Sequence, residues 1–136
     1  RMNTSDYAVG PTFTVARYGE TSTAVRYTGA WATSRSTSFW GGTTRRSSTT
    51  GATANFTFTG RSVGLVSYRG PDRGAATIYV NGTKVATMDL YARAKHARQI
   101  VWSMDWSTSA TRTITVRVAG TAGRPRVDID GFAVVR

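Results

Sequence analysis

The stretch that decides the fold is Gly70–Tyr91, GPDRGAATIYVNGTKVATMDLY. Within it Ala76, Ile78 and Val80 alternate with other residues, as expected of a strand with one buried face. Asn81-Gly82 follows, and both residues tolerate the positive φ that a tight primed hairpin turn needs. The stretch therefore predicts an antiparallel hairpin whose second strand ends at Tyr91.

A second stretch, Gly120–Phe132 (GTAGRPRVDIDGF), repeats the plan of a glycine- and proline-marked turn before strand-like alternation. Only two leucines occur, no helical period persists, and Ala92–Arg98 is interpreted as a loop or a single turn. Many short strands joined by turns predict an all-β fold, an antiparallel two-sheet jelly-roll sandwich. The expected strands are Phe13–Tyr18, Ala24–Tyr27, Ala54–Thr59, Val63–Tyr68, Ala75–Val80, Lys84–Tyr91, Gln99–Met104, Thr111–Val118 and Arg126–Val135.

The length of 136 residues suits a single domain. Residues 1–12 are polar and end in Gly10-Pro11, which predicts a tail or linker before one β-sandwich binding domain over residues 13–136. The absence of cysteine excludes disulfides and thiolate metal sites. No apolar run is long enough to predict a membrane span.

The chain is strongly basic, with 18 Lys and Arg against 7 Asp and Glu and a net charge of +11. The arginines are scattered, and the only dibasic step is Arg45-Arg46, without a recognised nucleic-acid motif. This pattern does not favour nucleic acid as a partner, since such binders usually show a basic stripe with aromatic stacking residues. Two interpretations stay open: a GC-rich coding bias, or attraction towards an acidic surface, such as a polysaccharide, another anionic envelope polymer or phospholipid headgroups.

Several motifs occur together and in order: YTGAW at 27–31, TTGATANFTFTG at 49–60, GPDRG at 70–74 and the closing VDIDGF at 127–132. Together they resemble the jelly-roll, galactose-binding-like (carbohydrate-binding-module-like) domain found near the C-terminal ends of large secreted proteins of GC-rich Gram-positive bacteria. The resemblance implies a non-catalytic module that binds a glycan or cell-envelope polysaccharide and is appended to a larger secreted, extracellular protein. The alternative is a structural or protein-interaction module without a sugar ligand, because fold alone does not set the ligand.

The architecture is similar, more distantly, to carbohydrate-binding modules of families six and thirty-five. Those modules close with an Asn-apolar-Asp-aromatic pattern, so the resemblance places Asp128 where a sugar-contacting Asn often sits. Members of the jelly-roll domain type named above usually have alanine at the position of Gly131, so this glycine is expected to loosen the last strand. The resemblance also implies a structural calcium held by acidic pairs in the first strand and an acid in the last. Since the first-strand region offers only Glu20, we predict no cofactor and no metal.

Sugar-binding surfaces present aromatic rings beside polar groups. Trp40 lies next to Gly41-Gly42 in a long Ser/Thr/Gly-rich segment and is predicted to be exposed, whereas Trp31 is predicted to pack in the core. The loops Thr33–Arg46, Arg69–Arg73 and Tyr91–Arg98 are expected to share one end of the sandwich. The predicted ligand-binding residues are Trp40, Arg45, Arg46, Arg69, Asp72, Arg73, Tyr91 and Asp128. Asp72 has an alternative role, as an acid that stabilises its own turn.

Catalysis is not predicted. Asp89, Asp128 and Asp130 are the carboxylates that a glycosidase would need, but acids at strand ends more often pair with arginines or backbone donors. His96 is the single histidine and no nucleophile elbow accompanies it. We therefore expect a binding module and not an enzyme.

Overall fold

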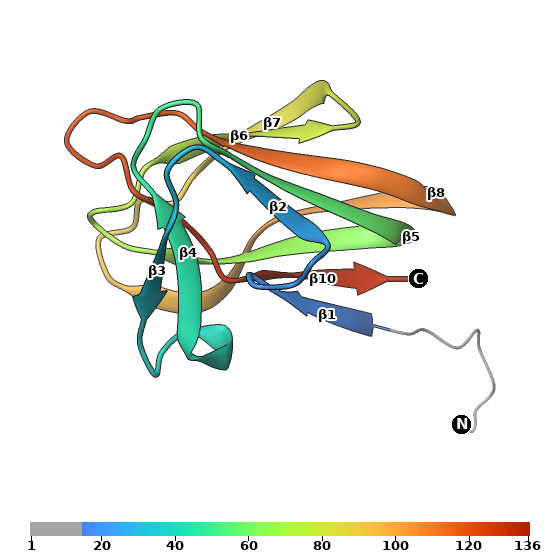
Figure 1. The fold of residues 1–136 in the computed structure, drawn as a ribbon, viewed down its shortest axis with the longest axis horizontal. Coiled ribbons are helices and arrows are strands. Elements are labelled where there is room, and N and C mark those ends of the chain that lie inside the picture. The colour runs from blue at the N-terminus through green and yellow to red at the C-terminus, as the bar shows by residue number, and fades with distance from the viewer. Residues whose placement is uncertain (1–14) are drawn as a thin grey trace.

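The computed structural model describes residues 15–136, so the predicted tail over residues 1–12 lies outside the described part. The described chain is all-β, as predicted (Figure 1). Its strands are β1 (Val15–Gly19), β2 (Val25–Thr28), β3 (Ala32–Arg35), β4 (Thr43–Ser47), β5 (Thr53–Arg69), β6 (Ala75–Val80), β7 (Thr83–Asp89), β8 (His96–Val118), β9 (Val127–Ile129) and β10 (Gly131–Val135), with one 3-10 turn, η1 (Trp40–Gly42).

The predicted hairpin is confirmed. β6 and β7 pair antiparallel, and Asn81 and Gly82 join them with φ of 49° and 83°. Two positive φ values in succession are what a primed turn requires. Ala76 and Ile78 are fully buried, so the alternation read from the sequence identifies the core face of β6 correctly.

β5 and β8 pair along most of their length and fold back together (Figure 1). The pairing register shifts between Gly60 and Ser62, where residues 106–109 of β8 form a bulge. Arg112 stabilises this corner by donating to the carbonyl oxygens of Gly60 at 2.7 Å and Thr108 at 3.3 Å. Each strand therefore belongs to both layers of the sandwich. The sequence predicted each of these strands as two.

One layer contains β2, β6, β7 and the halves of β5 and β8 that pair with them, and the other contains β1, β10 and the remaining halves. The predicted last strand is divided at Asp130, because β9 joins a separate sheet in the order β3-β4-β9. β3 and β4 lie in the serine- and threonine-rich segment that the sequence analysis treated as a loop. This small sheet lies across one end of the sandwich (Figure 1).

The core lies between the two layers. Phe56 of β5 stacks on Phe132 of β10 with ring centroids 4.3 Å apart, and both side chains are fully buried. Burying an aromatic or large aliphatic side chain contributes about 1.5–3 kcal/mol to folding. Trp31 packs against this core but is only half-buried, and its indole N–H donates to the Thr28 carbonyl at 3.0 Å.

Candidate functional site

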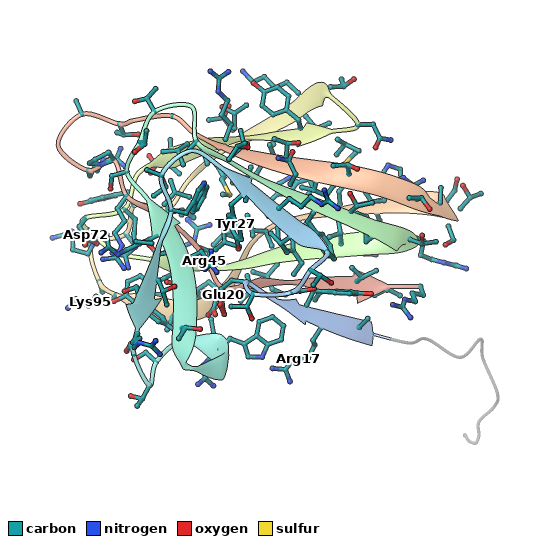
Figure 2. All side chains as sticks on the ribbon, viewed as in Figure 1. Arg17, Glu20, Tyr27, Arg45, Asp72 and Lys95 are labelled. Carbon is teal, nitrogen blue, oxygen red and sulfur yellow. The ribbon has the colours of Figure 1, made fainter. Side chains whose placement is uncertain are left out.

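Three loops form a hollow at one end of the sandwich, as the sequence predicted. The hollow has a volume of about 580 Å³ and is called the loop-end hollow below. Asp72 and Lys95, from two of these loops, lie at the same end of the molecule (Figure 2). The lining residues are Ser34, Ser36, Ser38, Phe39, Tyr68, Pro71, Asp72, Arg73, Lys95 and Arg126.

Asp128 lies beneath the hollow and is fully buried. Its carboxylate accepts hydrogen bonds from Arg126 Nε at 2.8 Å and Thr44 Oγ1 at 2.7 Å, and Arg73 Nε lies 2.9 Å from the same oxygen that Arg126 Nε contacts. A buried carboxylate needs such partners, because an unpaired charge in the interior is costly. The predicted contact between Asp128 and a sugar therefore does not fit its position. Its role is to hold two arginines under the hollow.

Arg73 is also placed differently from the prediction. Its side chain is 4% exposed, its guanidinium lies 4.3 Å from the centroid of the Tyr68 ring, and it donates to Asp72. The Tyr68 ring meets Phe39 edge to face, with centroids 5.7 Å apart. Arg73 thus supports an aromatic wall and is itself mostly covered.

The accessible part of the hollow is polar. Asp72 is 63% exposed and Lys95 is exposed. Arg126 is 25% exposed, and its Nη2 donates to Ser34 Oγ at 3.2 Å. Ser36 Oγ accepts the Ser38 N–H at 3.1 Å. Hydroxyls, a carboxylate and cations beside an aromatic wall are the groups that orient a polar small ligand. The ligand-binding residues predicted from the sequence include Asp72 but not Tyr68, Lys95 or the serines, although Lys95 and the serines lie in the predicted loops.

Arg69 and Tyr91 belong to a neighbouring cluster outside the lining of the hollow. Arg69 donates to the Asp89 carbonyl at 2.9 Å, and Arg124 binds both carboxylate oxygens of Asp89 at 2.6 and 3.0 Å. The Arg124 hydrogen bonds hold the pKa of Asp89 below its ordinary value. Tyr91 is 45% exposed, with the Arg124 guanidinium 5.1 Å from its ring centroid. This cluster fixes the loop beside the hollow.

Trp40 is half-buried and does not have the exposed ring that the sequence predicted. The Arg17 guanidinium lies 4.1 Å from its ring centroid. A Cβ placed on Gly131 would come within 2.7 Å of Trp40 Cζ3, so the ring occupies space that only glycine leaves free. Gly131 therefore makes room for Trp40, and the loosening of the last strand stays a prediction. The ring borders a separate groove of about 430 Å³ with Val15, Arg17, Val66, Arg98, Ile100 and Ala133.

Arg45 and Arg46 lie on opposite faces of β4 and outside the lining of the hollow. Arg45 is half-buried, with its guanidinium 5.2 Å from the Tyr27 ring centroid, and Figure 2 shows it in the same region as Glu20. Arg46 is exposed and pairs in register with Asp128 of β9. The structure therefore brings Asp72 and Arg73 to the hollow, with Asp128 beneath them, and leaves the other predicted residues outside it.

Glu20 and Asp130 form a buried acidic pair. Asp130 Oδ2 accepts the Trp40 backbone N–H at 2.8 Å, while Oδ1 has no hydrogen-bond partner among the described residues. Both Glu20 oxygens accept from the Thr43 hydroxyl, at 3.0 and 3.1 Å. Loss of hydration raises the pKa of Asp130 to about 6, and the nearby charge of Glu20 adds to this effect.

This pair is the nearest approach to the calcium site that the resemblance implied. The described residues hold no group of three or more His, Cys, Asp or Glu that is arranged for a metal. Calcium takes about six to eight oxygen ligands, and two carboxylates alone do not supply them. The side chains present therefore do not fit a calcium site, and the metal-free state stays a prediction.

Comparisons with known proteins identify the fold. No protein-family model matches the chain, and no curated protein sequence matches it either. Solved structures do match. A two-domain esterase active on acetylated mannans aligns with a TM-score of 0.72 at 14% identity, over 99% of this chain and 40% of the esterase chain. A Paenibacillus xanthan lyase aligns with a TM-score of 0.63 at 13% identity, over 87% of this chain and 13% of the lyase.

An exo-β-1,3-galactanase from Phanerochaete chrysosporium aligns similarly, with a TM-score of 0.59 at 16% identity, over 90% of this chain and 29% of the galactanase. The chain thus spans less than half the length of each of these proteins. At such low identities the alignments show a shared β-sandwich fold, of a type present in carbohydrate-active proteins. Among the described residues no helix is long and apolar enough to cross a membrane.

Proposed function

We propose that this domain is a non-catalytic module that binds a polysaccharide at the loop-end hollow and belongs to a larger secreted protein. The observation that carries the proposal is the composition of the hollow. The Tyr68 ring, with the buried Phe39 packed edge to face against it, borders a space lined by serine hydroxyls, Asp72 and Lys95. Apolar ring surface beside hydrogen-bonding groups suits a pyranose, which has apolar C–H faces and a rim of hydroxyls.

The placement of the carboxylates supports binding without catalysis. A glycosidase needs two carboxyl groups flanking the scissile bond with free access to substrate. Asp128 and Asp130 are fully buried, and Asp89 is held by Arg124. Asp72 is the acid that lines the hollow, and a single accessible carboxylate does not meet the requirement.

The test measures binding of soluble polysaccharides to the purified chain by isothermal titration calorimetry. Asp72→Ala removes an exposed acid from the rim, and Asp105→Ala removes an exposed acid from β8, outside the hollow. We expect Asp72→Ala to weaken binding about tenfold, as for loss of a hydrogen bond to a charged group, and Asp105→Ala to bind like the parent chain. No release of reducing ends should accompany binding.

The proposal fails if no polysaccharide binds, or if both variants bind as the parent does. The first result would favour the interaction-module alternative. The second would place the site elsewhere on the surface. Release of reducing ends at a rate proportional to protein concentration would instead make the domain an enzyme.

A further inference from the structure

The charges around the loop-end hollow do not cancel. Its lining contains three cations, Arg73, Lys95 and Arg126, and one acid, Asp72. Asp128 lies directly beneath and adds a second negative charge. Three positive and two negative groups leave one positive charge in excess at the hollow.

The contacts identify which cation carries this excess. Arg73 is paired with Asp72 and Asp128, and Arg126 donates through Nε and Nη2 to the Asp128 carboxylate at 2.8 and 3.1 Å. Lys95 takes part in no ion pair within residues 15–136 and is exposed at the rim. The excess charge is therefore that of the Lys95 ammonium, and a ligand can approach it.

We propose that the loop-end hollow selects an acidic sugar, with the ligand's carboxylate bound by Lys95 and its pyranose ring seated between the Tyr68 wall and the serine hydroxyls. This inference rests on the proposed function, because it names the class of glycan for that same site. Lysine presents a compact charge on a flexible stem, which suits a carboxylate whose position varies with ring pucker and linkage. Arg126 also lines the hollow, with 25% of its side chain exposed.

The net charge of +11 complicates any test, because it attracts polyanions to the whole surface. The chain offers a matched control in its only other lysine, Lys84, which is exposed on β7 of the hairpin and lies outside the hollow. Lys95→Gln and Lys84→Gln change the net charge equally. A difference between the two variants therefore reports the local site and not the overall field.

The probes are galacturonate oligosaccharides and their methyl esters, which share a backbone and differ in the carboxylate charge. Affinities are measured by calorimetry at about 0.15 M salt, where the Debye length is about 8 Å and distant charges are screened. We expect the free acid to bind at least tenfold more tightly than the ester to the parent chain and to Lys84→Gln. In Lys95→Gln this preference should be lost, while ester binding is unchanged.

Three other outcomes would overturn the acidic-sugar inference. Equal binding of acid and ester by the parent chain overturns the acidic-sugar inference and leaves the proposed function standing. Equal loss of affinity in both lysine variants also overturns it, because the preference would then come from net charge. Absence of binding to either probe overturns the inference, and the wider polysaccharide panel then decides the proposed function separately.

Discussion

Replacing Asp130 with asparagine should remove a pH dependence that the buried acidic pair gives to folding. In the folded chain burial raises the pKa of Asp130 from 3.8 to about 6. The folded state therefore holds the Asp130 proton more tightly than the unfolded state does. Stability should rise as the pH falls through about 6, and the gain should be complete below the unfolded pKa.

The size of the effect follows from the same values. One pKa unit corresponds to 1.36 kcal/mol, so a rise from 3.8 to about 6 is worth about 3 kcal/mol well below the unfolded pKa, of which about 2 kcal/mol develops between pH 7 and pH 4. For a domain of 136 residues this corresponds to roughly 10 °C in melting temperature. In asparagine the carboxamide oxygen still accepts the Trp40 N–H, and there is no charge to titrate.

The assay is urea unfolding of the parent chain and Asp130→Asn at pH 7, 5.5 and 4, with chelator present so that no metal neutralises the pair. Other acids titrate in both proteins, so the informative quantity is the difference between the two free energies of unfolding at each pH. Relative to the variant, the free energy of unfolding of the parent should rise by about 2 kcal/mol between pH 7 and pH 4. Asp105→Asn, at an exposed position, serves as the control. Parallel curves for the parent and Asp130→Asn would refute the reasoning.

Three further predictions concern the same region. Gly131→Ala should lower the free energy of unfolding, measured in urea, by about 1–3 kcal/mol. A Cβ at this position would lie 2.7 Å from Trp40 Cζ3 and 2.6 Å from the Tyr18 carbonyl oxygen. An unchanged urea midpoint would contradict the placement of the Trp40 ring against Gly131. Trp40→Ala should lower the free energy of unfolding by about 2 kcal/mol, roughly half the value for a fully buried aromatic residue. The affinity for polysaccharide should stay within twofold of that of the parent chain. Loss of binding in a variant that still folds would identify Trp40 as a ligand-binding residue. Calcium at about 5 mM should leave the melting temperature at pH 7 unchanged, and a rise of several degrees would show that the acidic pair binds the ion.

The hairpin and the β-sandwich could be predicted because their signals are local. Alternation in β6 and the Asn81-Gly82 turn depend only on residues close in sequence. The strands β3 and β4 were not predicted, because their sequences do not alternate apolar and polar residues. Thr44 of β4 is buried although it is polar, and its hydroxyl donates a hydrogen bond to Asp128. The folding back of β5 and β8 depends on a bulge at residues 106–109 opposite Arg61, and such a pairing has no local signature.

The candidate site was predicted in part for the same reason. The GPDRG turn carries its own signal, and Asp72 does line the hollow. Trp40 was placed wrongly because the space that receives its ring is created by Gly131, which lies 91 residues later in the chain. Asp128 matched a sugar-contacting position by its place in the motif, but the burial that excludes it from ligand depends on Arg73 and Arg126 meeting it in three dimensions.

The pairing of β1 with β10 has a mechanical consequence. Val15 lies opposite Val135 and Gly19 opposite Gly131. The first residue of β1 and the last residue of β10 therefore lie side by side at the same end of the pair. A pulling force on both ends would act across the strands, along their hydrogen bonds, and would break these bonds one pair after another. β1 would detach first and take Tyr18 away from Phe56, whose ring centroid lies 5.1 Å from that of Tyr18. Under tension the domain should therefore open from this edge at low force, by unzipping and not by shear.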